Sequence, residues 1–176
     1  KAAELGLYGL YTPEEYGGSG ADLVSVCLVS EELAKASPSF AGMLTVQMVL
    51  CPKAVEILGT EEQKQRILPL SASGERLMAY SQSEPSGAAN IGTHLTKVVP
   101  DGNGYRIDGS KLFCTQGTAG TWLVMAKSKD RQGSEGYGCF IVEREDEGFE
   151  VAPHEDKLGW RGTNTGPIAF NNVRLE

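Results

Sequence analysis

Hydrophobic and polar residues alternate with a helical period in the first third of the chain. From Leu23 to Ala34 the apolar residues fall on one face of a helix, and two adjacent glutamates fall on the opposite face. Asp22 stands directly before this segment and has a side chain that can accept hydrogen bonds from the first helical amides. The pattern predicts an amphipathic helix that ends at Ser37 and Pro38.

Further helices are predicted between this segment and the middle of the chain. Residues 40–50 are apolar almost all round, which indicates a buried helix. Pro52 suits the first turn of a separate short helix, and Gly59 suits its end. The Thr60–Gln63 segment is a capping box, worth about 1 kcal/mol, that opens a last helix. Gly74 is expected to end that helix, so the first third of the chain is predicted to be helical.

After the helical part the apolar runs become short and are separated by turn residues, which is typical of β-strands. The segment from Asp101 to Gly104, Asp-Gly-Asn-Gly, has the composition of a hairpin turn. The predicted strands cover residues 77–83, 95–99, 105–108, 112–115, 122–127, 137–142, 150–153 and 168–173. Short strands at close spacing favour an antiparallel barrel or sandwich. The predicted fold is therefore α+β, with a helical N-terminal domain at 1–75 and a β-barrel domain at 76–176.

The composition is that of an ordinary folded protein. Of the 176 residues, 40% are hydrophobic, which is too many for a disordered chain. The net charge of −7 argues against nucleic acid as the main partner. The four cysteines lie far apart, and neither His94 nor His154 has a metal-ligand spacing to them, so neither a disulfide framework nor a zinc site is expected. We see no signal peptide and no apolar run of about 20 residues, so we expect no membrane span.

Two segments combine a strand end with small residues and together suggest a ligand site. The first, from Tyr80 to Asn90, leaves an apolar strand, turns at a proline and continues through glycine and alanine. The second, residues 109–117, ends another predicted strand. Ser83 and Thr115 could hydrogen-bond the edge of a flat heterocycle such as a flavin, and Phe113 could lie against its face. By pattern alone these residues are better explained as ordinary strand residues.

Other chemically active side chains in these segments have two interpretations each. Glu84 could act as a general base, but we prefer a structural role in which Glu-Pro fixes the turn and the carboxylate caps nearby amides. Cys114 could be a reactive thiol, yet no cation adjoins it, so a buried and inert cysteine is favoured. Arg161 lies in the segment Gly-Trp-Arg-Gly at 159–162. It could bind a carboxylate or phosphate, or it could form a structural ion pair.

Taken together, these segments resemble the acyl-CoA dehydrogenase family in their order and spacing. The match extends over nearly the whole chain. The matching segments are Pro-Glu-Glu-Tyr-Gly-Gly-Ser-Gly at 13–20, the capped helix at 59–69, Ser-Glu-Pro at 83–85, Gly-Ser-Lys-Leu-Phe-Cys-Thr-Gln-Gly at 109–117, and the segments 155–165 and 170–173. The resemblance implies a helical N-terminal domain, a β-barrel middle domain and FAD in a cleft beside the barrel.

The same resemblance implies a set of roles and partners. The residues that would contact FAD are Tyr80, Gln82, Ser83, Phe113, Cys114 and Thr115. The implied reaction is oxidation of an acyl-CoA thioester to the 2,3-enoyl-CoA in fatty acid metabolism, with FAD as hydride acceptor. Electrons would pass to an electron-transferring flavoprotein. The full-length protein is expected to be a homo-oligomer, as a homotetramer, in the cytoplasm or alternatively in the mitochondrial matrix, without nucleic-acid or membrane partners.

The sequence departs from the family pattern in two places. Ala89 stands where the family has a substrate-binding serine, and loss of one such hydroxyl contact costs about 1 kcal/mol. The family also continues into a C-terminal helical domain that supplies the catalytic glutamate. We therefore expect no catalytic residue in this chain, no turnover by it alone and little retained FAD. Alternatives are a non-catalytic acyl-CoA-binding or assembly module, or an acyl-CoA oxidase or flavin monooxygenase of the same fold.

Overall fold

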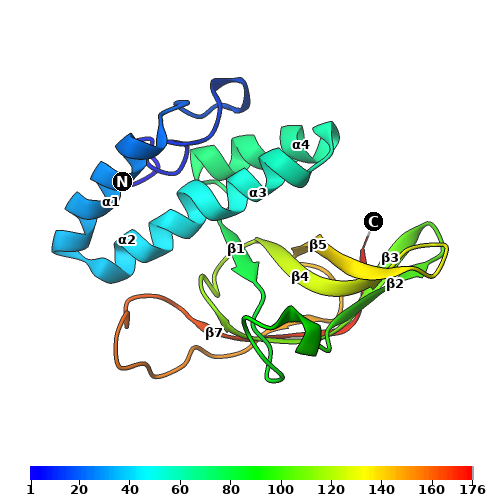
Figure 1. Cartoon of the computed structure of the whole chain (residues 1–176). Coiled ribbons are helices and arrows are strands. Elements are labelled where there is room, and N and C mark those ends of the chain that lie inside the picture. Colours follow the sequence, from blue (N-terminus) through cyan, green and yellow to red (C-terminus); the bar gives the residue numbers. More distant parts are fainter. Residues whose placement is uncertain (176) are drawn as a thin grey trace. The chain divides into compact units, whose positions relative to one another are not determined.

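The computed structural model describes residues 1–175 and contains two compact units (Figure 1). The helical unit comprises residues 1–78 together with 157–163. The β unit comprises residues 79–156 together with the segment from Asn164 onward. Glu176, with which the predicted β domain ends, lies outside the described residues.

Capping residues start the helices of the helical unit where the sequence predicts. Helix α1, Leu23–Ala36, begins after Asp22, whose carboxylate accepts a hydrogen bond from the Ser25 amide at 2.8 Å. Helix α4, Glu61–Ser73, has both reciprocal bonds of the predicted capping box, and Gly74 ends it in a left-handed conformation with φ +77°. The predicted caps at both ends of α4 are therefore confirmed.

The two central helices of the prediction form one continuous helix. Helix α2, Pro38–Thr45, leads through a π-helical segment, Val46–Leu50, directly into helix α3, Cys51–Leu58. The expected break before Pro52 is absent. A proline has no amide hydrogen and its ring crowds the carbonyl four residues earlier, and the wider π-turn directly before it gives the chain room to continue.

As a result, the joined helix Pro38–Leu58 is 21 residues long, and its length and apolar composition alone would allow it to cross a membrane. The sequence analysis expected no apolar run of about 20 residues, so the continuous helix corrects that expectation. In the structure Leu44 and Met48 of this helix are buried together with Val26 of α1. The fully buried Gln47 donates from Nε2 to Ser71 Oγ at 2.9 Å and accepts from the Met78 amide at 2.6 Å, so it joins α4 to the start of the first strand.

The β unit is a curled seven-stranded sheet (Figure 1). The strands are β1 Met78–Ser81, β2 Lys97–Asp101, β3 Gly104–Cys114, β4 Thr121–Lys129, β5 Glu135–Glu143, β6 Phe149–Val151 and β7 Gly166–Leu175. Their order is β1-β4-β2-β3-β7-β6, and β5 also pairs with β4 outside this path. The registered pairs are antiparallel except β2 with β4, which run parallel, so the sheet is mixed rather than purely antiparallel. The predicted hairpin between Asp101 and Gly104 joins β2 to β3.

Two of the predicted strands, 105–108 and 112–115, are parts of the single strand β3. Its pairing with β7 shifts register between Ile107 and Gly109, and again between Lys111 and Cys114. Gly109 has φ +140°, and a Cβ atom there would lie 2.5 Å from Thr96 Oγ1. The glycine thus allows a bulge and a close approach of the neighbouring chain, where the sequence pattern suggested the end of a strand.

Candidate functional site

The two segments that the sequence suggests as a ligand site lie side by side in the β unit. The amide of Leu112 donates to the carbonyl of Ser83 at 2.8 Å. The ammonium group of Lys111 donates to the carbonyl of Gln82 at 3.0 Å. These bonds run from β3 to the chain that leaves β1. The segments 81–84 and 111–115 are therefore hydrogen-bonded neighbours.

Glu84 is buried beneath this junction and is fully occupied by structural contacts. Its carboxylate accepts hydrogen bonds from the amides of Leu95 and Thr96, and from Lys111 Nζ at 2.7 Å. Burial would raise the pKa of Glu84, but Lys111 and the two amides outweigh it and lower the pKa to about 2. The carboxylate is therefore ionised and paired, which confirms the capping role and makes it a poor general base.

Phe113 is the most unusual residue of the site. Its side chain is 65% exposed, and its backbone has φ +56°, a conformation that aromatic residues seldom adopt. Gln116, three residues later, also has positive φ. Ser83 and Thr115 are half-buried, so neither is sealed inside the barrel. The bulge at the end of β3 thus leaves the Phe113 ring exposed, while Ser83 and Thr115 are half-buried.

The other residues predicted to contact a ligand differ in how deeply they are buried. Tyr80 donates from its hydroxyl to Gln82 Oε1 at 2.6 Å, and Gln82 donates from Nε2 to the carbonyl of Ala88 at 3.3 Å. Ala89 is exposed on the loop. The Cys114 side chain is buried, and burial raises the pKa of its thiol to about 11, so the inert interpretation is confirmed. The residue as a whole is 2% exposed, so its thiol does not reach the surface.

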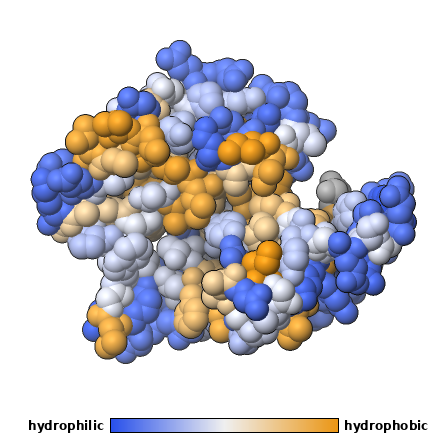
Figure 2. Space-filling model, in the orientation of Figure 1, coloured by the Kyte–Doolittle hydropathy of each residue, from blue (hydrophilic) through white to orange (hydrophobic). Residues whose placement is uncertain are grey.

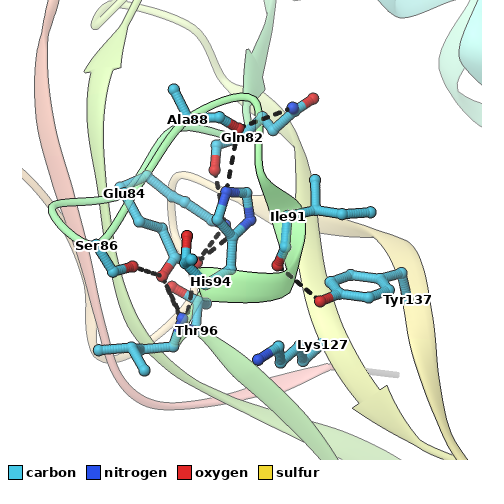
Figure 3. Close-up of polar contacts among 12 residues, drawn as sticks. Gln82, Glu84, Ser86, Ala88, Ile91, His94, Thr96, Lys127 and Tyr137 are labelled. Atoms are coloured by element: carbon cyan, nitrogen blue, oxygen red, sulfur yellow. Dashed lines mark hydrogen bonds and ion pairs between the residues drawn. The ribbon is translucent and has the colours of Figure 1, made fainter.

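Sequence reasoning missed the polar contacts that hold the loop between β1 and β2 (Figure 3). His94 is buried, with Nε2 placed 3.2 Å from the carbonyl of Ala88. Tyr137 of β5 donates to the carbonyl of Ile91 at 2.6 Å (Figure 3). Lys127 of β4 donates to the carbonyl of Gly92 at 2.9 Å. No local pattern indicates these roles, because the partners are backbone carbonyls of a loop that lies 35 to 46 residues away from Lys127 and Tyr137.

A metal centre and the predicted anion-binding arginine are two further candidates. Within the described residues 1–175, no group of three or more His, Cys, Asp or Glu side chains could hold a metal ion. Arg161 belongs to the helical unit and is exposed. The site therefore offers hydroxyl groups, backbone amides and one exposed aromatic ring, which suits a flat organic group with polar edges.

Comparison with known proteins agrees with this architecture. Residues 1–75 match the N-terminal domain of acyl-CoA dehydrogenases, and residues 79–173 match their middle domain. The short-chain specific acyl-CoA dehydrogenase of Clostridium acetobutylicum is 35% identical over 98% of this chain and 46% of its own length. The mitochondrial isobutyryl-CoA dehydrogenase of Dictyostelium discoideum is 34% identical over 99% of this chain and 42% of its own length.

Solved structures give the same result. A chain from the structural work on the electron transferring flavoprotein of Acidaminococcus fermentans has a TM-score of 0.92 and 35% identity, over 99% of this chain and 46% of that chain. The acyl-CoA dehydrogenase of Bacillus anthracis, complexed with FAD, has a TM-score of 0.89 and 32% identity, over 99% of this chain and 30% of that chain. The chain spans about half the length of the curated relatives it matches. With both domains matched in order along its length, this chain belongs to the acyl-CoA dehydrogenase family.

Proposed function

We propose that the chain is the N-terminal and middle part of an FAD-dependent acyl-CoA dehydrogenase. The observation that carries this proposal is the exposed ring of Phe113, held at φ +56° beside the chain at Ser83. A left-handed backbone at a bulky residue costs about 1 kcal/mol or more and is found mainly where function requires it. Stacking against a flat cofactor is a function that requires an exposed ring in a fixed place.

The residues present fit an isoalloxazine ring. Phe113 would lie against its face, and the hydroxyls of Ser83 and Thr115 would bond its edge, supported by Tyr80 and Gln82. The backbone of Cys114 would complete the contact between Phe113 and Thr115. When bound, FAD supplies a hydride acceptor for the oxidation of an acyl-CoA thioester to the 2,3-enoyl-CoA.

The wider assignments follow from the family and are part of the proposal. The helical domain at 1–75 and the β domain at 76–176 would act with a further helical domain that supplies the catalytic base. The assembled enzyme would be a homo-oligomer, such as a homotetramer, that passes electrons to an electron-transferring flavoprotein. The bacterial relative supports the cytoplasm, and the mitochondrial relative supports the matrix as the alternative.

Flavin titration tests the cofactor site directly. We expect the purified 176-residue chain to be nearly colourless and to bind added FAD weakly, with quenching of flavin fluorescence. Phe113→Ala should weaken that binding about fivefold, since an aromatic contact contributes about 1 kcal/mol. Trp160→Ala removes another exposed aromatic ring at positive φ and serves as the matched control. Equal affinity of wild type and Phe113→Ala would contradict the proposed site, and a stoichiometric yellow flavin after purification would contradict the expected weak retention.

A further inference from the structure

The turn between β2 and β3 contains a chemically reactive pair of residues. Asn103 is exposed and is followed by Gly104, whereas the other four asparagines of the chain precede isoleucine, threonine, asparagine or valine. Asparagine is thermolabile because the backbone nitrogen of the next residue can attack its side-chain amide. A following glycine has no Cβ atom to hinder this attack. Asn103 is therefore the asparagine of this chain with the least steric protection.

The reaction replaces the side-chain amide by a carboxylate and needs only water. The amide nitrogen of Gly104 loses its proton to solvent and forms a bond to Asn103 Cγ, while the Cγ–Nδ2 bond breaks and ammonia leaves. Water then opens the resulting succinimide ring at one of its two carbonyl carbons. Opening at Cγ gives aspartate, and opening at the main-chain carbonyl carbon gives isoaspartate. Ammonia is lost, water is gained, and nothing is oxidised or reduced.

The folded hairpin restrains the attacking nitrogen. Asp101 and Gly104 are paired across the ladder of β2 and β3, with two residues between them. Gly102 has φ +61° and Asn103 has a negative φ, as in a type II′ turn. In such a turn the amide of the fourth residue donates to the carbonyl of the first. The nitrogen of Gly104 is therefore held within the sheet.

Arg131 holds the other side of the same turn. It lies in the loop between β4 and β5, which runs beside the β2–β3 turn (Figure 1). Its Nη1 donates to the carbonyl of Gly102 and its Nη2 to the carbonyl of Asn103, each at 2.8 Å. Its guanidinium carbon also lies 5.8 Å from the centre of the Tyr105 ring, in a cation–π contact that steadies the arginine.

These contacts fix the one peptide group that must move. The carbonyl of Asn103 and the nitrogen of Gly104 belong to the same planar group, which Arg131 holds at the oxygen and the ladder holds at the nitrogen. Ring closure requires this group to rotate about the Cα–C bond of Asn103, and the rotation breaks both contacts. The attack therefore requires local opening of the turn.

We propose that Asn103 is a site of spontaneous deamidation and that Arg131 sets its rate by holding the turn closed. Either product places a new carboxylate next to the Arg131 guanidinium. The isoaspartyl product also adds a CH2 group to the main chain, which is incompatible with a two-residue turn in the present register.

The first experiment identifies the modified residue. The purified 176-residue chain is kept in a mildly alkaline buffer and sampled by peptide mass spectrometry. We expect the mass change of NH2 replaced by OH in the peptide that contains Asn103, with an isoaspartyl form that an isoaspartate-specific methyltransferase labels. Asn90 and Asn164 are also exposed and serve as internal controls that should react much more slowly. Equal conversion of the three asparagines, or no isoaspartate at position 103, overturns the assignment.

The second experiment tests the role of Arg131. Arg131→Met removes both bonds to the turn, and the deamidation rate of the folded chain should rise about fivefold, the effect of losing one net hydrogen bond. Arg131→Lys keeps the charge without the two-pronged contact and should give an intermediate rate. Arg144→Met removes another exposed arginine, which donates to the carbonyl of Gly117, and should leave the rate at Asn103 unchanged.

The same proteins unfolded in guanidinium chloride give the reference rate. All four chains should then deamidate equally fast at Asn103, because they share the local Asn-Gly sequence. A folded Arg131→Met chain that reacts no faster than wild type overturns the role of Arg131. So does a difference between the two chains that persists after unfolding.

Discussion

Lys111 shows how one buried charge can join two elements of this protein. Its side chain is fully buried in β3, and its ammonium group reaches both the carboxylate of Glu84 and the carbonyl of Gln82. Burying an ammonium group is unfavourable unless its hydrogen bonds are satisfied. The pair therefore holds the chain after β1 against β3 at the place where the candidate site begins.

Removing Lys111 should be strongly destabilising. Lys111→Met leaves Glu84 buried without its counter-charge, and we expect a loss of about 3–5 kcal/mol in the free energy of unfolding, measured by urea titration. Lys129→Met breaks an exposed pair with Glu135 and should cost less than about 1 kcal/mol. Equal effects of the two substitutions would contradict the structural role of the buried pair.

The acid stability of the protein should depend on Glu84. Its folded pKa of about 2 lies below the ordinary value of 4.5. The resulting stabilisation is therefore present above pH 4.5 and is lost as the pH falls towards 2, with a size of roughly 3 kcal/mol. Glu84→Gln should be less stable at neutral pH and should show a shallower loss of stability between pH 4.5 and 2 in chemical denaturation. Parallel pH profiles for the two proteins would contradict this assignment.

Thr115 should affect the flavin more than the fold. The residue is half-buried at the bend after β3, so Thr115→Ala should lower stability by less than about 1 kcal/mol. Loss of one hydrogen bond to a reduced flavin corresponds to a shift of roughly 20 mV in a two-electron potential. Spectroelectrochemical titration of the FAD-loaded protein measures this shift, with the exposed Thr118→Ala as control. An unchanged potential together with a large fall in melting temperature would favour a purely structural role.

At the scale of elements, the helix Pro38–Leu58 depends on a close fit with the loop at 157–163. Gly42 faces Trp160, and a Cβ atom at Gly42 would lie 2.2 Å from the Trp160 ring. The amide of Gly162 also donates to Ser39 Oγ at 3.3 Å, near the start of the same helix. The glycine is therefore explained by packing, although alanine has the higher helix propensity.

The fit predicts a reversal of the usual effect of alanine. Gly42→Ala should destabilise the protein by about 1–3 kcal/mol through overpacking, as measured by urea unfolding. In a Trp160→Ala background the same substitution should instead stabilise by up to about 1 kcal/mol, because only helix propensity remains. Stabilisation by Gly42→Ala in the wild-type background would show that Trp160 does not fill this space.

Elements fixed by local interactions could be predicted from the sequence, and those fixed by distant partners could not. The cap at Asp22 and the cap at Thr60 each bond an amide only three residues further along the chain. Their sequence patterns were therefore sufficient to predict them. The bulge at Gly109 depends on Thr96 across the sheet, so the pattern suggested a strand end. In the site, the sequence suggested that Glu84 caps amides, but the donors at Leu95, Thr96 and Lys111 are 11, 12 and 27 residues away and could not be named from it. The contribution of His94 depends on the folded path of the whole loop.

At the scale of the whole molecule, apolar side chains are exposed on the helical unit. Leu23, Val24 and Leu28 of α1 are each more than half exposed, as are Ile57 and Leu58 at the end of α3. Figure 2 shows apolar patches on the surface of the molecule. Groups of exposed apolar residues, such as the three on α1, are typical of surfaces that another domain or subunit covers. This agrees with a chain that spans about half the length of its relatives.

The backbone conformation of Phe113 implies a conflict between the thermal stability of the protein and its contact with the cofactor. Glycine or asparagine adopts φ +56° more readily than phenylalanine, so either would relax the end of β3. Selection of variants for thermal endurance alone should therefore drive position 113 towards these small residues. Selection for a tightly held flavin should retain the aromatic ring. The two kinds of selection should therefore favour different residues at position 113.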